Sequence, residues 1–173
     1  MDAIKITSYN PQWPALFLNE KQLLESRLAQ QSVSAIDHIG STAIPGMPAK
    51  PIIDILISVP SVDEAKRTFP DILDRIGYDY WSDNPKKDRL FFVRGMPPRG
   101  DGRTHHVHVH EKENVVKDHL IFRNYLREAP DEASKYAELK QMLAKKYAQD
   151  REAYTEAKSD FIKAILGKAR ETQ

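Results

Sequence analysis

Two segments decide the fold of this chain, Asp37-His38-Ile39-Gly40-Ser41-Thr42 and, after a proline-rich loop, Lys50-Pro51-Ile52-Ile53-Asp54-Ile55-Leu56-Ile57. The first predicts a strand that ends in a Gly-Ser turn, and the second predicts a strand that carries a single carboxylate. Gly40 allows the backbone to approach a ligand closely, and Ser41 and Thr42 offer hydroxyl and N–H donors to an anion. Burial of the Asp54 carboxylate among isoleucines is costly unless a partner or a metal ion holds it.

The strand predicted over 52–59 lies at the centre of the expected sheet. Period-two alternation places two sets of residues on opposite faces, Ile52, Asp54, Leu56 and Ser58 on one and Ile53, Ile55, Ile57 and Val59 on the other. Both faces are largely apolar, which is typical of a strand that is covered on both sides.

The rest of the chain alternates helices and strands before position 112 and is helical after it. Hydrophobic periodicity and a capping box at Ser61 and Glu64 predict helices over 15–30, 61–76, 114–128, 131–149 and 151–170. Further strands are predicted over 33–39, 78–81, 89–94 and 104–111, and one short helical turn after Ser41. We therefore predict a single α+β domain over 1–173, with a mixed α/β core over 1–112 and a three-helix C-terminal part over 113–170.

Composition excludes several classes of partner and site. The 173 residues suffice for one buried core, and 26 basic against 25 acidic side chains give a formal net charge of +1. A protein that neutralises nucleic-acid phosphates would carry a clear basic excess, so we do not expect a nucleic-acid partner. Cysteine is absent, which rules out disulfides and thiolate metal sites. Without a signal peptide or an apolar run of membrane-spanning length, we expect a cytoplasmic protein without membrane contact.

A second informative strand reads Thr104-His105-His106-Val107-His108-Val109-His110. His106, His108 and His110 share one face, and histidines at positions i and i+2 of a strand are a spacing used by transition-metal sites. If this strand lies beside the Asp54 strand, Asp54, His106 and His108 predict a site of two histidines and one carboxylate. The alternative is that the histidines line a polar site without metal. His108, in the middle of the row, is the candidate that matters most.

Basic side chains on the C-terminal helices are candidates for contact with an anion. Arg123 and Arg127 are separated by one helical turn and point the same way. Lys158 follows Tyr154 by one turn on a partly apolar helix face. The alternative for each is a surface charge paired with a neighbouring glutamate.

Five stretches of the sequence share a pattern with a known family. They are the run His38-Ile-Gly-Ser-Thr-Ala-Ile-Pro-Gly, the run Ala49-Lys-Pro-Ile-Ile-Asp54-Ile, the His-Val-His-Val strand, Phe122-Arg123-Asn124-Tyr125-Leu126-Arg127 and Glu156-Ala157-Lys158. By these stretches the chain resembles the GrpB family, a branch of the nucleotidyltransferase-like superfamily in which some members are fused to dephospho-CoA kinase. The resemblance covers nearly the whole chain.

The resemblance implies a nucleotidyltransferase-like mixed β-sheet with flanking helices. It also implies a Gly-Ser turn that binds nucleotide phosphates and an Asp-x-Asp strand that binds magnesium. Gly40, Ser41 and Asp54 match this pattern, and Arg123 and Lys158 stand out among the basic residues. The second metal carboxylate would fall at Leu56, on the same strand face as Asp54. This departure bears on catalysis more than on ligand binding.

Three functions remain open at this point. In a nucleotidyltransferase, Gly40, Ser41 and Thr42 would hold a nucleoside triphosphate, and Asp54 and His108 would act at the reacting centre with a divalent metal, magnesium, manganese or zinc. A binding module without turnover would recognise a nucleotide or a coenzyme A-like ligand, and Leu56 favours it. A metal-dependent hydrolase would use the histidines with Asp54. The expected partner is a nucleotide or another phosphorylated small molecule, and the acceptor and oligomeric state stay open.

Overall fold

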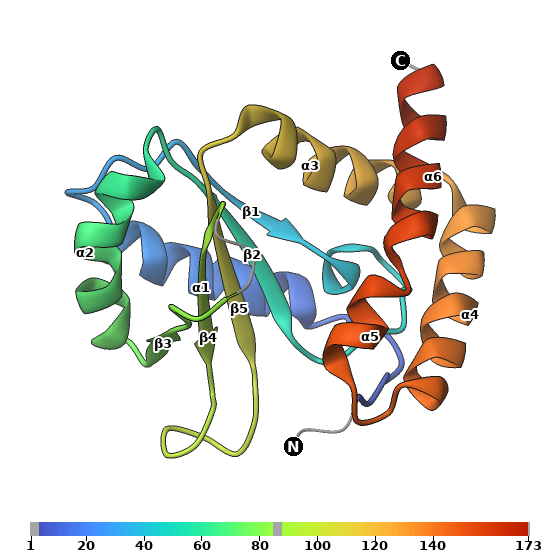
Figure 1. Ribbon diagram of the computed structural model, residues 1–173, viewed down its shortest axis with the longest axis horizontal. Coiled ribbons are helices and arrows are strands. Elements are labelled where there is room, and N and C mark those ends of the chain that lie inside the picture. Colours follow the sequence, from blue (N-terminus) through green and yellow to red (C-terminus); the bar gives the residue numbers. More distant parts are fainter. Residues whose placement is uncertain (1–3, 85–87, 173) are drawn as a thin grey trace.

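The computed structural model describes residues 4–84 and 88–172 and forms a five-stranded mixed sheet with helices on both sides (Figure 1). The strands are β1 Ala35–Ile39, β2 Ile53–Ser58, β3 Tyr78–Tyr80, β4 Leu90–Arg94 and β5 His105–His110. Their order in the sheet is β1-β2-β5-β4-β3. Strands β2 and β5 are parallel, and the other neighbours are antiparallel.

Helices α1 (Trp13–Arg27) and α2 (Val62–Asp74) cover one face of the sheet. The main core lies beneath them, and in it the side chains of Ile55, Phe92 and Val107 are fully buried. Trp13 and Phe17 attach α1 to this core, as its helical periodicity predicts. Because Ile55 faces α1 and α2, the period-two alternation of β2 turns Asp54 and Leu56 to the opposite face.

The C-terminal helices gather at the other side of the sheet, next to β1 and the segment that follows it (Figure 1). They are α3 Glu113–Glu128, α4 Pro130–Lys146, α5 Arg151–Glu156 and α6 Ser159–Glu171. A second apolar cluster joins α3, α4 and α6 to Ile44 and Met47 of the loop between β1 and β2. The C-terminal helices are therefore fixed directly to the loop that carries the Gly-Ser turn.

The predicted α+β class and the predicted strands are confirmed, and so is the short helical turn, a 3-10 helix over Ser41–Ala43. The single helix predicted over 151–170 is wrong, because the chain breaks into α5 and α6 at Ala157 and Lys158. The two halves bury side chains in different places. Tyr154 joins a cluster with Ile4 and Leu143, whereas Phe161 packs beside Tyr136. No helix in the described part of the chain is long and apolar enough to cross a membrane.

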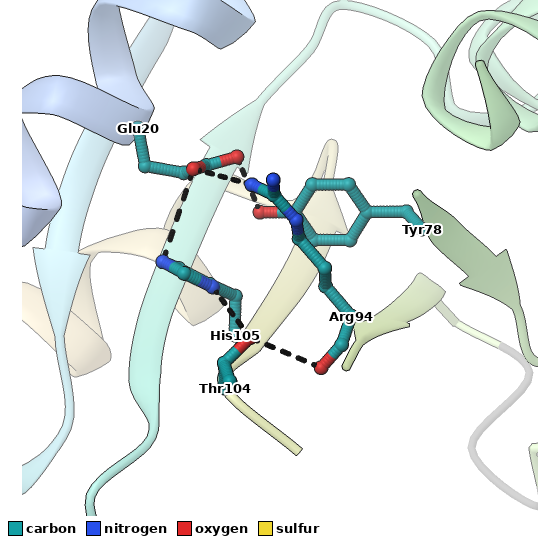
Figure 2. Close-up of polar contacts among 5 residues, drawn as sticks. All are labelled: Glu20, Tyr78, Arg94, Thr104 and His105. Carbon is teal, nitrogen blue, oxygen red and sulfur yellow. Dashed lines mark hydrogen bonds and ion pairs between the residues drawn. The ribbon is translucent and has the colours of Figure 1, made fainter. Parts of the chain in front are cut away.

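A buried polar network lies on the α1 side of the sheet (Figure 2). Glu20 of α1 accepts hydrogen bonds from the hydroxyl of Tyr78 at 3.0 Å and from Arg94 at 2.7 Å. The Nε2 atom of His105 lies 3.8 Å from the same carboxylate. His105 therefore belongs to a structural network on the face opposite Asp54, in agreement with the strand alternation.

Replacement of Glu20 by alanine is expected to lower the free energy of unfolding by about 2 kcal/mol, because the Tyr78 hydroxyl and the Arg94 guanidinium lose their shared acceptor. Denaturant unfolding measures the change. Glu25→Ala is the matched control on the same helix, since Glu25 makes only an exposed pair with Lys21 at 3.8 Å, and it should change the value by about 0.5 kcal/mol or less. Equal losses in the two variants would contradict a stabilising role for the network.

Candidate functional site

The parallel pairing of β2 with β5 brings the predicted site together. Asp54 pairs with His106 and Leu56 pairs with His108, in register and on one face of the sheet. The adjacency on which the predicted constellation depends is therefore present. His108 lies beside Leu56, so an imidazole from the neighbouring strand stands next to the position at which the resemblance implied a second carboxylate.

Three side chains converge at this point of the sheet. Nδ1 of His106 lies 3.0 Å from Oδ1 of Asp54, and Nε2 of His108 lies 3.5 Å from the same oxygen. One ligand atom from each residue lies within 4.8 Å of the others. Ligand atoms about 2 Å from a shared ion are separated by such distances, so this donor set fits a divalent ion. Two imidazoles and one carboxylate suit zinc, nickel or iron better than magnesium.

The three groups carry one negative charge between them. Burial alone would raise the pKa of Asp54, but hydrogen bonds from His106 and His108 hold that pKa well below its usual range. Burial lowers the pKa of His106, and it lowers the pKa of His108 to about 3. At neutral pH the carboxylate is ionised and both imidazoles are neutral, which is the protonation state that binds a cation.

Arg89 determines the tautomer of His108. Its guanidinium lies 2.8 Å from Nδ1 of His108 and can only donate, so Nδ1 must accept and the ring proton must lie on Nε2, facing Asp54. A metal ion at Nε2 would require this proton to leave and Nδ1 to carry one. Histidines that bind metals usually donate their second N–H to an acceptor, whereas here the second nitrogen meets a donor. Arg89 therefore opposes metal binding through His108.

Arg89→Met is expected to tighten the binding of Zn²⁺ or Mn²⁺ by roughly tenfold, because Nδ1 of His108 is then free to carry the proton. Competition with a chromophoric chelator measures the affinity. His108→Ala should weaken binding, and Arg67→Met, on the exposed surface of α2, should leave it unchanged. Unchanged or weaker binding by Arg89→Met would show that Arg89 does not oppose the ion.

The Gly-Ser turn touches the carboxylate directly. Gly40 has a φ of 72°, and a Cβ atom at this position would lie 2.6 Å from Oδ2 of Asp54. Glycine is required here for two reasons, a left-handed backbone and the close approach of an acidic side chain. Gly40 therefore places the start of the 3-10 helix at Ser41 against the same carboxylate that contacts the histidines.

Gly40→Ala should cost more stability than Gly46→Ala. Both glycines have a positive φ, 72° and 75°, but a Cβ at Gly46 meets nothing within 4 Å. The backbone strain of about 1 kcal/mol is common to both variants, so the excess at Gly40 measures the clash with Asp54. We expect an excess of about 1–3 kcal/mol in denaturant unfolding. Equal losses would show that Asp54 moves aside without cost.

Within the turn, the hydroxyl of Thr42 is already engaged. It lies 2.9 Å from Nε2 of His38 and donates to the carbonyl of Ile52 at 3.4 Å. His38 is itself buried and stacks on Phe17, with ring centroids 4.7 Å apart, and burial lowers its pKa to about 4. The Thr42 side chain thus holds the turn together, which leaves only its backbone to meet a phosphate. The Ser41 hydroxyl is engaged as well, in a hydrogen bond with the phenol of Tyr136.

Arg123 and Arg127 point the same way, as predicted, and both bind backbone carbonyls on either side of the turn. Arg123 donates to the carbonyl of His38 at 2.9 Å, and Arg127 donates twice to that of Ala43, at 2.9 and 2.7 Å. These contacts fix α3 to the Gly-Ser turn. A direct contact of Arg123 with phosphate stays a prediction, since the contacts that Arg123 makes with backbone carbonyls are structural.

Three lysines lie close to one another, and we call Lys50, Lys140 and Lys158 the lysine cluster. Lys50 is the member within electrostatic range of Asp54. The ammonium groups of Lys158 and Lys50 lie 4.3 and 5.3 Å from the ring centroid of Tyr154. Lys140 is 2% exposed, and its ammonium group donates to the carbonyl of Pro48. Burial, with the positive charges of Lys158 and Lys50, lowers the pKa of Lys140 to about 7. Burial also lowers the pKa of Lys50, while Asp54 raises it and Arg151 and Arg103 lower it.

Sequence reasoning placed Lys158 near a possible anion but missed Lys140, and it gave Lys50 no role. A signal for Lys140 exists, because it shares a helical face with the buried Tyr136 and Leu143. A lysine at an apolar spacing is either a snorkelling side chain or a buried cation that needs a partner. The partner, the carbonyl of Pro48, comes from a distant loop and has no sequence signal.

Comparison with known proteins agrees with the fold and the motifs. The family model described as GrpB protein matches residues 3–168, so the chain belongs to the GrpB family. A UPF0157 protein of Pseudomonas aeruginosa is 45% identical over 168 residues, which make up 97% of this chain and 68% of that protein. The crystal structure of the conserved protein GrpB from Enterococcus faecalis matches with a TM-score of 0.83 at 36% identity and covers 97% of this chain and 98% of that one.

A more distant relative is a protein of Mycolicibacterium paratuberculosis named dephospho-CoA kinase. It is 26% identical over 191 residues, and the match spans 96% of this chain and 46% of that protein. This relation agrees with the expectation that GrpB-like segments occur within longer kinase-named chains.

Proposed function

We propose that this protein binds a nucleotide or a related polyphosphate ligand together with a divalent metal, in the manner of a nucleotidyltransferase. The observation that carries the proposal is the lysine cluster, in which Lys50 lies close enough to Asp54 for the carboxylate to raise its pKa, in a chain whose formal net charge is only +1. The lysine cluster comes from three separate segments, the loop before β2, α4 and the break between α5 and α6. The positive charges of Lys158 and Lys50 lower the pKa of Lys140, and a bound anion would offset this repulsion.

In this proposal the phosphates lie between the Gly-Ser turn and the lysine cluster. Ser41 would exchange its hydrogen bond with Tyr136 for one to a phosphate oxygen, and the ammonium groups of Lys50 and Lys158 offer charge without the bidentate geometry of arginine. Asp54, His106 and His108 would hold the divalent ion, which when bound would neutralise phosphate charge. The contact between Gly40 and Asp54 keeps the phosphate side and the metal side of the site next to each other.

Transfer of a nucleotidyl group would require an acceptor oxygen to bond to the α-phosphorus while the bond to pyrophosphate breaks. Asp54 is the single carboxylate of the superfamily pattern in β2, and His108 stands beside Leu56 in place of the second one. A neutral imidazole neutralises less metal charge than a carboxylate does. This difference favours a softer metal ion than magnesium, and it supports a second candidate function, a binding module without turnover.

The test is isothermal titration with ATP and with inorganic tripolyphosphate, each with and without Mn²⁺. Metal-dependent binding that is lost in Asp54→Asn supports the proposed site, and release of pyrophosphate with a candidate acceptor would identify the transferase. Binding without metal dependence and without turnover would favour the binding module. Absence of binding by either polyphosphate under all conditions would overturn the proposal.

Binding of tripolyphosphate at pH 8 should take up a proton at Lys140. In the free protein the pKa of Lys140 is about 7 against an ordinary value of 10.5, so the side chain is mostly neutral at pH 8. A bound polyanion raises the pKa of Lys140, and the proton that Lys140 then takes up comes from the buffer. The measured enthalpy should then differ between Tris and HEPES buffers by the difference in their ionisation enthalpies.

Lys140→Met should remove the uptake and weaken binding by roughly tenfold or more, the value of a charged hydrogen bond. Lys145→Met, on the exposed face of the same helix, is the matched control and should change neither quantity. Equal enthalpies of the wild-type protein in the two buffers would show that Lys140 does not respond to the ligand.

A further inference from the structure

Trp81 is an exposed aromatic side chain beside the candidate site. It is 43% exposed, and it is the aromatic member of the four large exposed apolar side chains in the described residues, with Leu16, Leu18 and Met142. Its backbone N–H donates to the carbonyl of Phe91 at 2.9 Å, which extends the pairing of β3 with β4 by one residue. Because Tyr78 and Tyr80 face the core, strand alternation turns Trp81 to the face that carries Asp54.

An unbroken series of ring contacts joins Trp81 to the Asp54 site. The rings of Trp81 and Phe91 stack with centroids 5.9 Å apart and planes at 28°. Phe91 in turn lies against both candidate metal ligands, with centroids 5.1 Å from His106 and 5.0 Å from His108. Phe91 is buried, whereas Trp81 presents its indole to solvent. We call Trp81 and Phe91 the aromatic wall.

Arg103 links the aromatic wall with the charged part of the site. Its guanidinium lies over the indole of Trp81, 4.7 Å from the ring centroid. The same positive charge is close enough to lower the pKa of both His106 and Lys50. The Arg103 guanidinium thus contacts Trp81 and lies within electrostatic range of His106 and Lys50.

The Gly-Ser turn and Trp81 lie on different strands of the sheet and offer two kinds of binding surface, one for anions and one for aromatic rings. The Gly-Ser turn follows β1 and contacts Asp54 in β2, while Trp81 lies beyond β5 and β4 at the end of β3. Three strand spacings between β2 and β3 correspond to about 14 Å. A ligand that reaches both surfaces must be extended, anionic at one end and planar and aromatic at the other. A nucleoside polyphosphate and coenzyme A have this form, whereas an inorganic polyphosphate has no ring.

We propose that Trp81, backed by Phe91, forms together with the Arg103 guanidinium that lies over its indole a stacking subsite for the planar base of the ligand whose phosphates lie at Ser41 and the lysine cluster. This inference rests on the proposed function and adds the chemical class of the distal part of the ligand. Stacking on the indole accepts any base and needs no hydrogen-bond donor or acceptor. The subsite therefore selects ligands that carry an aromatic ring, without a preference among the four bases.

The test compares ATP, coenzyme A and tripolyphosphate, each with Mn²⁺, in the wild-type protein, Trp81→Ala and Trp81→Phe. Trp81→Ala should weaken the binding of ATP by at least about fivefold and leave the binding of tripolyphosphate unchanged. Trp81→Phe keeps a stacking ring and should retain most of the affinity for ATP. Leu18→Ala, at an exposed position on α1, is the control and should alter neither ligand. Weakening of coenzyme A as well as ATP identifies the adenine ring as the shared recognised group.

Tryptophan fluorescence gives an independent readout. The chain has two tryptophans, and Trp13 is buried in the core, so a ligand-induced quench that disappears in Trp81→Phe reports on Trp81. ATP should quench and tripolyphosphate should not. If ATP binds tightly without a quench and with equal affinity in Trp81→Ala, the stacking subsite is overturned and the proposed function stands.

If ATP and tripolyphosphate both fail to bind, the proposed function fails. The stacking subsite is then tested separately with adenosine at millimolar concentration. A fluorescence quench by adenosine that is lost in Trp81→Phe supports the stacking subsite, and the absence of a quench overturns it.

Discussion

The contact between the Asp54 carboxylate and its neighbours sets the geometry of the whole candidate site. Burial opposes an ionised side chain here, and hydrogen bonds from two neutral imidazoles outweigh that cost. The same carboxylate lies so close to Gly40 that a Cβ is excluded. Three elements, the turn after β1, β2 and β5, are thus held in register at one point, and every other proposed contact is positioned relative to it.

The two faces of the sheet carry different polar groups. Structural polar groups lie on the α1 face, and the candidate functional groups lie on the opposite face. On the α1 face, Glu20 satisfies Tyr78 and Arg94 and approaches His105. On the other face, positively charged side chains lie close together. There the Arg89 guanidinium donates to His108, which favours a different tautomer of His108 from the one that a metal ion would require. Ionisable side chains in unfavourable surroundings are typical of binding sites, because a bound ligand can supply the charge or the hydrogen bond that the fold lacks.

Much of the site follows from the sequence because strands have a strict period. Alternation alone places Asp54 with Leu56, and His106 with His108, on single faces, and the motif around Gly40 marks the turn. The sequence could not predict that β2 and β5 are neighbours, because strand pairing depends on the packing of segments that lie far apart in the chain. The predicted metal site therefore remained conditional on this pairing. Lys140 and Trp81 were missed for a similar reason, because their significance depends on Pro48 and Phe91. The break between α5 and α6 arises because Tyr154 and Phe161 pack into separate clusters.

The most direct measurement of the central claim is a crystal structure of the protein with Mn²⁺ and a non-hydrolysable ATP analogue, with anomalous diffraction used to locate the manganese. We expect one anomalous peak within about 2.0–2.3 Å of the Asp54 carboxylate and an imidazole nitrogen. We also expect phosphate density between Ser41 and the lysine cluster. Manganese bound away from Asp54, or an analogue whose phosphates lie elsewhere, would rule out the proposed site.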